Sequence, residues 1–107
     1  MPKISVIIPN YNGRQFLETC LSSLKKQTYT DFEAILVDDA SSDESLSFVQ
    51  TYYPDTRIIG LKKNVGFASA VNEGIRQARG QYIALLNNDT ETDNKWLMEL
   101  NQVLESR

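Results

Sequence analysis

The residues best suited to chemistry lie together near position 88, where Asn87, Asn88 and Asp89 follow the apolar run Tyr82 to Leu86. Because a short apolar run is typical of a buried strand, these three side chains should stand where that strand ends. Carboxylate and amide oxygens suit hard cations, and Mg²⁺ in proteins is usually held by one or two carboxylates together with a phosphate. The pattern therefore predicts a site for Mg²⁺ or Mn²⁺ at Asp89, with a phosphate compound bound beside it.

Three other loops carry polar side chains directly after predicted strands. They cover residues 9–13 (Pro9, Asn10, Tyr11, Asn12, Gly13), residues 38–43 (Asp38, Asp39, Ala40, Ser41, Ser42, Asp43) and residues 62–66 (Lys62, Lys63, Asn64, Val65, Gly66). The strands of a parallel sheet end on one edge, and ligands bind in the crevice at that edge. We therefore expect these loops and Asp89 to meet around one pocket.

The residues of these loops have two interpretations that the sequence leaves open. Tyr11 is either a platform for a nucleobase or one member of a turn. Asp38 and Asp39 either accept hydrogen bonds from a ring N–H or ribose hydroxyls, or form a turn that places negative charge at a helix N-terminus. Gly66 either lets backbone N–H groups approach an anion or lets the next helix pack closely. Because Asp38 continues a buried strand directly, we favour a ligand role for at least one aspartate.

The elements that must position these loops alternate along the chain. Short runs rich in apolar residues predict buried strands at 4–8, 34–37, 58–61 and 82–86. Apolar residues at helical spacing predict helices within 16–24, 46–53, 67–78 and 96–104. This alternation indicates right-handed βαβ crossovers and an α/β fold, an open and mainly parallel Rossmann-like sheet with helices on both faces.

Single residues give signals for the boundaries of these elements. We expect Pro9 to end the first strand, Ser41 and Glu44 to form a capping box for the second helix, and Gly80 to cap the third. Gly74 lies inside the third helix, where glycine costs about 1 kcal/mol relative to alanine. We therefore expect a packing reason for Gly74.

Composition excludes several classes of protein. A chain of 107 residues fits one domain, residues 1–107. The net charge of -3 argues against a nucleic-acid partner, and the lack of histidine excludes Ser-His-Asp chemistry and the usual zinc sites. Cys20 is the only cysteine, and no apolar run reaches the length of a membrane span. Together these features favour a cytoplasmic protein whose metal, if it has one, is bound by oxygen.

Four ordered motifs resemble those of family 2 glycosyltransferases, nucleotide-sugar-dependent enzymes of the GT-A fold. They are residues 5–12 (SVIIPNYN), 37–43 (VDDASSD, similar to VDDxSxD), 64–72 (NVGFASAVN, similar to NxGxAxAxN) and 85–90 (LLNNDT, at the place of the metal-binding DXD-like motif). The resemblance spans nearly the whole chain and implies the donor-binding, N-terminal part of a GT-A domain. It departs from the family pattern at Asn87, which replaces the first acidic residue and leaves Asp89 as the one firm carboxylate ligand.

The resemblance implies a role for each matched residue. Pro9 and Tyr11 would line the base and ribose pocket, and Asp39 would hydrogen-bond the pyrimidine ring. Asn88 would lie against ribose or phosphate, and Asp89 would bind the Mg²⁺ or Mn²⁺ that bridges the diphosphate. The predicted nucleotide-sugar site further includes neighbouring residues of the same motifs, Asn10, Asn12, Asp38 and Gly66.

The resemblance also implies partners. The donor would be a UDP- or dTDP-sugar, since the Asn-Asn-Asp-Thr form resembles a rhamnosyltransferase-like subset. The acceptor would be a saccharide or a lipid-linked sugar, and transfer would invert the anomeric centre with a general base that we expect beyond Arg107. No catalytic residue is expected within the chain itself. Enzymes of the family commonly work at the inner face of the cell membrane, so peripheral association with that face is part of the expectation.

Two alternatives from other classes remain at this point. A receiver-type signalling module would use Asp38 and Asp39 to bind Mg²⁺ and accept a phosphoryl group, although its acidic pair should follow the first strand. A non-catalytic assembly fragment would form a homo-oligomer by pairing the free edge of its sheet with another copy.

Overall fold

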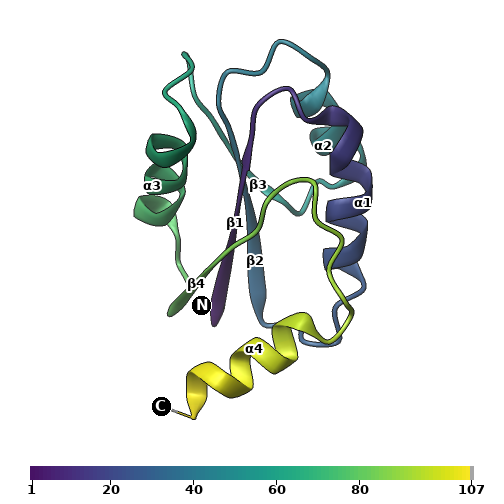
Figure 1. Ribbon diagram of the computed structural model, residues 1–107, viewed down its shortest axis with the longest axis vertical. Helices are drawn as coiled ribbons and strands as arrows, with labels where there is room; N and C mark the ends of the chain where they lie inside the picture. Colours follow the sequence, from purple (N-terminus) through teal and green to yellow (C-terminus); the bar gives the residue numbers. More distant parts are fainter. Residues whose placement is uncertain (107) are drawn as a thin grey trace.

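The computed structural model describes residues 1–106, which fold as four strands alternating with four helices (Figure 1). In chain order these are β1 (Ile4–Asn10), α1 (Arg14–Lys25), β2 (Phe32–Asp38), α2 (Ser45–Tyr52), β3 (Arg57–Gly60), α3 (Phe67–Gln77), β4 (Tyr82–Leu85) and α4 (Trp96–Glu105). Within these residues no helix has both the length and the hydropathy that a membrane crossing requires.

The strands form one sheet in the order β3-β2-β1-β4, and every neighbouring pair is parallel. The predicted α/β fold is therefore confirmed. Because all four strands run the same way, their carboxyl ends lie together at the upper end of the sheet in Figure 1, and the loops that follow the strands start there. We call this end of the sheet its carboxyl edge. Helix α4 crosses the opposite end, close to the amino ends of the strands.

Two apolar layers cover the two faces of the sheet. Helices α1 and α2 lie on one face, where Leu17 and Val49 pack with Ile4, Val6 and Ile8, while α3 lies on the other (Figure 1). Alternate residues of a strand point to opposite faces, so one strand supplies both layers.

Helix α3 approaches its face of the sheet closely because it carries Gly74. A Cβ atom at Gly74 would lie 2.7 Å from Cγ2 of Ile7 and 2.9 Å from Cγ2 of Val37. The packing reason expected for this glycine is confirmed.

Strand β1 continues past Pro9, contrary to the expected boundary, and Pro9 pairs in register with Val37. The carbonyl oxygen of Ile7 accepts a hydrogen bond from the backbone N–H of Leu86, directly after β4, at 2.9 Å. Alternate residues of a strand direct their backbone groups to the same neighbour, so the backbone of Pro9 also faces the β4 side. Strand β4 ends at Leu85, the partner of Ile7, so the ladder between β1 and β4 needs no N–H from Pro9.

Two expected helix caps are wrong. The N-cap of helix α2 is Glu44, which makes no side-chain capping bond, so Ser41 and Glu44 form no capping box. Oδ1 of Asp43, one residue earlier, accepts hydrogen bonds from the backbone N–H (2.9 Å) and the hydroxyl (2.5 Å) of Ser45. Helix α3 ends at Gln77, before Gly80. Gly80 instead touches β1, where a Cβ would lie 2.6 Å from the backbone nitrogen of Ser5.

A polar cluster ties the sheet together away from the carboxyl edge. The carboxylate of Glu33 accepts hydrogen bonds from the Ser5 hydroxyl (2.6 Å), the Arg57 guanidinium (2.8 Å) and the Arg79 backbone N–H (2.7 Å). Burial alone would raise the pKa of this carboxyl, but these donors outweigh burial and hold the pKa below its ordinary value of 4.5. The cluster therefore depends on an ionised Glu33.

We expect Glu33→Gln to lower the free energy of unfolding by about 1 kcal/mol at pH 7, because Arg57 loses a charged partner. The folded-state pKa of Glu33 lies below the unfolded-state value. Its stabilisation is thus complete above the unfolded pKa and is lost as the pH falls through the folded pKa. Urea unfolding at several pH values should show a shallower loss of stability in acid for Glu33→Gln than for wild type. Glu91→Gln, at an exposed position, is the control, and parallel pH curves for all three proteins would contradict the assignment.

Candidate nucleotide-binding site

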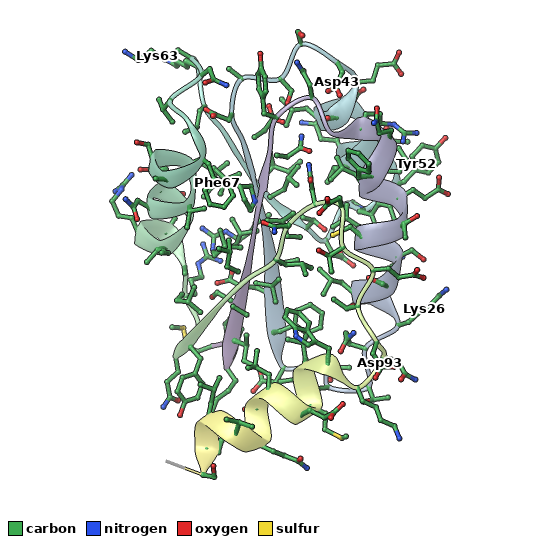
Figure 2. The ribbon with its side chains drawn as sticks, viewed as in Figure 1. Lys26, Asp43, Tyr52, Lys63, Phe67 and Asp93 are labelled. Atoms are coloured by element: carbon green, nitrogen blue, oxygen red, sulfur yellow. The ribbon has the colours of Figure 1, made fainter. Side chains whose placement is uncertain are left out.

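A pocket of about 510 Å³ opens at the carboxyl edge of the sheet. Residues from the end of β1, from the loops after all four strands and from the start of α3 line it: Pro9, Asn10, Tyr11, Asp39, Asn64, Gly66, Phe67, Ala70, Asn87, Asn88 and Asp89. In Figure 2, Lys63 and Asp43 mark this end of the molecule, and Asp93 marks the opposite end. The structure thus brings the four polar loops together, as the parallel order of the strands requires.

Asp39 lines the pocket and holds the backbone that leads into α3. Its two carboxylate oxygens accept hydrogen bonds from the backbone N–H groups of Val65 (2.8 Å) and Gly66 (3.0 Å), which lie at the start of α3. Gly66 has φ 92° and ψ 165°, a backbone conformation that is essentially restricted to glycine. An ionised carboxylate offers about four acceptor positions, so Asp39 keeps capacity for a ligand in the pocket that it lines.

Asp38, the neighbouring aspartate, faces the protein and is absent from the pocket lining. Its Oδ1 accepts hydrogen bonds from the Asn10 amide (3.0 Å) and the Ser41 hydroxyl (2.7 Å), and its Oδ2 accepts from the Ser41 backbone N–H (3.0 Å). Only 1 % of Asp38 is exposed. The contacts of Asp38 join the loops after β1 and β2.

Asn10 lines the pocket, but both the nitrogen and the oxygen of its side-chain amide already form hydrogen bonds within the protein. Its Nδ2 donates to Asp38, and its Oδ1 accepts from the amide of Asn88 at 2.8 Å. Gly13 leaves room for this contact, because a Cβ there would lie 2.2 Å from Nδ2 of Asn88.

Asn12 is also absent from the lining, and it holds the loop after β2. Its Oδ1 accepts from the backbone N–H groups of Ser42 (2.8 Å) and Asp43 (3.2 Å). Its backbone has φ 52°, which asparagine tolerates better than most residues.

Two exposed aromatic side chains border the pocket. Tyr11 is 56 % exposed and Phe67 is 58 % exposed, and both contribute to the lining. The apolar spacing of α3 suggested a core position for Phe67, so sequence reasoning missed it as a site residue. The available signal was its place directly after Gly66, at the start of a helix that follows a strand. Asn64 and Ala70 were missed as well.

Asp89 is exposed at the pocket mouth beside Asn87. Within residues 1–106 no three His, Cys, Asp or Glu side chains gather as a metal site would need. Cys20 lies behind Asn87, but burial and the charge of Asp89 raise the pKa of its thiol to about 11, so the thiol stays protonated. The donor set fits a hard cation that takes one carboxylate from the protein and its other ligands from phosphate and water.

Comparison with known proteins assigns the chain to a protein family. A sequence profile described as Glycosyl transferase family 2 matches residues 5–107, and the chain belongs to that family. The glycosyltransferase EpsJ of Bacillus subtilis, whose function is described as uncharacterized, is 37% identical over 107 residues, covering 98% of this chain and 31% of EpsJ. The receiver-type alternative is not favoured.

Two solved structures share the fold. S. aureus TarS 1-349 in complex with UDP-GlcNAc superposes with a TM-score of 0.90 at 28% identity, covering 97% of this chain and 31% of that one. The mannosyltransferase PcManGT from Pyrobaculum calidifontis, in complex with GDP-Man and Mn²⁺, gives a TM-score of 0.75 at 29% identity over 84% of this chain and 28% of that one. The chain thus spans about a third of the length of EpsJ and of these proteins.

Proposed function

We propose that this chain forms the donor-binding part of an inverting glycosyltransferase that takes its sugar from a UDP- or dTDP-sugar. The observation that carries the proposal is the pocket at the carboxyl edge, where Asp39, Asp89 and two exposed aromatic rings come from separate loops to one cavity. The nucleotide-sugar complexes of the similar structures support a ligand of this class.

In this proposal five of the lining residues contact the donor or its cation. Tyr11 stacks on the pyrimidine, and Asp39 accepts the ring N–H with the lone pairs that Val65 and Gly66 leave free. Pro9 and Asn88 lie against the ribose side. Asp89 holds Mg²⁺ or Mn²⁺, which when bound neutralises charge on the leaving diphosphate. The Mn²⁺ in the PcManGT complex supports a divalent cation.

The acceptor is a saccharide or lipid-linked sugar, and the general base that deprotonates its hydroxyl lies beyond Arg107. The protein works in the cytoplasm, with peripheral association at the inner membrane face. Strand β4 is at the edge of the sheet with Ile83 and Leu85 exposed, and a second copy would pair there if the chain forms homo-oligomers.

Calorimetric titration with UDP, dTDP and ADP, each with Mg²⁺ and with EDTA, tests the proposal. We expect saturable binding of the pyrimidine diphosphates that is stronger with Mg²⁺, and weaker binding of ADP. No heat of binding at millimolar UDP with Mg²⁺ would overturn the proposal.

Tyr11→Ala is expected to weaken UDP binding about tenfold, because stacking of a base on an aromatic ring contributes about 1–3 kcal/mol. Tyr52→Ala is the matched control. Tyr52 is also exposed but lies on α2, away from the pocket (Figure 2). Equal dissociation constants for Tyr11→Ala and wild type would remove Tyr11 from the base site.

A further inference from the structure

The side-chain amide of Asn10 lies between two other polar side chains, those of Asp38 and Asn88. Its Nδ2 is 3.0 Å from Oδ1 of Asp38, and its Oδ1 is 2.8 Å from Nδ2 of Asn88. These residues come from three neighbouring strands or the loops after them. A row of hydrogen bonds thus crosses the sheet edge from the buried Asp38 to the pocket.

Chemistry fixes the direction of this row. Both carboxylate oxygens of Asp38 accept hydrogen bonds from Ser41, so Asp38 is an acceptor and the Asn10 atom that faces it must be the amide nitrogen. The oxygen of Asn10 then faces Asn88, and the Asn88 atom that faces it must again be the nitrogen. The remaining amide atom of Asn88, its oxygen, is the one left for the pocket that this residue lines.

We propose that Asp38 is a positioning residue which, through Asn10, orients the Asn88 amide with its oxygen toward the bound donor. This inference rests on the proposed function for the identity of the ligand. The Asn88 oxygen and the Asp89 carboxylate then form a stretch of pocket wall made of hydrogen-bond acceptors. Such a wall takes hydroxyl groups or the waters of a hydrated cation, and it repels bare phosphate oxygens. A diphosphate can lie against it only with a cation in between.

Reversing the row tests the proposal. In Asp38→Asn, the new amide can donate to Asn10 and accept from the Ser41 N–H. The side-chain amides of Asn10 and Asn88 then rotate by about half a turn, and the Asn88 nitrogen faces the pocket. We expect little loss of stability and about tenfold weaker binding of UDP with Mg²⁺. In Asn88→Asp, the new carboxylate cannot donate to Asn10 while Asp38 remains, and we expect a clear fall in stability.

The double variant D38N/N88D restores a consistent row in the reverse direction. If the two single effects simply added, they would predict a certain equilibrium constant for unfolding of the double variant. We expect the measured constant to favour the folded state about tenfold more than that prediction. D55N/N88D is the matched control, since it has the same net charge but changes the exposed Asp55. Additive effects in D38N/N88D, or equal recovery in D55N/N88D, would overturn the proposal.

Proton exchange of side-chain amides gives a second measurement that needs no unstable variant. In the wild-type protein the NH₂ groups of Asn10 and Asn88 should both exchange more slowly than that of the exposed Asn94. In Asp38→Asn, exchange at Asn88 should become fast while exchange at Asn10 stays slow. Unchanged slow exchange at Asn88 would contradict the inference. Neither this experiment nor the unfolding experiment requires nucleotide, so failure of UDP binding would count against the proposed function alone.

Discussion

Replacing Asp89 by asparagine is expected to weaken UDP binding in the presence of Mg²⁺ about 100-fold and to leave the weak binding in EDTA nearly unchanged. Of the two carboxylates that line the pocket, Asp89 has no hydrogen-bond partner within residues 1–106, whereas both oxygens of Asp39 accept from the backbone just before α3. Losing even the partner of a metal ligand costs about 10–100-fold in metal affinity, so a lost ligand should cost at least the upper figure. Calorimetry with and without Mg²⁺ measures both quantities.

Glu91→Gln is the control for Asp89→Asn, because Glu91 is an exposed carboxylate two residues further along the same loop. It should bind UDP with Mg²⁺ as the wild type does. If Glu91→Gln shows the large loss and Asp89→Asn does not, the cation ligand has been assigned to the wrong residue.

Gly74→Ala is expected to lower the free energy of unfolding by about 2 kcal/mol and the Tm by roughly 10 °C. The added methyl would meet Ile7 and Val37, whose branched side chains are stiff, on two strands at once. Overpacking of this kind costs about 1–3 kcal/mol, which exceeds the helix-propensity gain of about 1 kcal/mol. Because α3 must move away from the sheet, and Ala70 of α3 lines the pocket, UDP binding should weaken as well.

Gly60→Ala is the matched substitution for Gly74→Ala. A Cβ at Gly60 meets nothing within 4 Å, and its φ lies outside the left-handed region, so its stability should be unchanged or slightly raised. Thermal unfolding of both variants measures the difference. An equal or higher Tm for Gly74→Ala would show that α3 can shift without cost.

The order of strands and helices could be predicted because short apolar runs and helical spacing are properties of neighbouring residues. The shared edge followed from the parallel direction of the strands. Local patterns also misled. Pro9 is tolerated inside β1 only because β4 ends early, and this depends on a strand more than 70 residues away in the chain.

The sequence could not predict that Asp39 lines the pocket while Asp38 faces the protein interior. Both carboxylates follow the same strand, and their roles depend on partners from other loops. Asp38 is bound by Asn10 and Ser41, whereas Asp39 binds the backbone at the start of α3. Phe67 was hidden for a similar reason, since its apolar character fits a helix face equally well in the core or at a pocket rim.

Paramagnetic broadening of amide NMR signals by Mn²⁺ tests most directly whether the carboxyl-edge pocket binds a nucleotide diphosphate through a cation at Asp89. With UDP present, low concentrations of Mn²⁺ should broaden the signals of Asn88, Asp89 and Thr90 first, and should spare the α4 end of the molecule. Without UDP the same Mn²⁺ should have a much smaller effect, because the diphosphate supplies much of the coordination. Broadening centred elsewhere, or the same broadening with and without UDP, would contradict the proposed site.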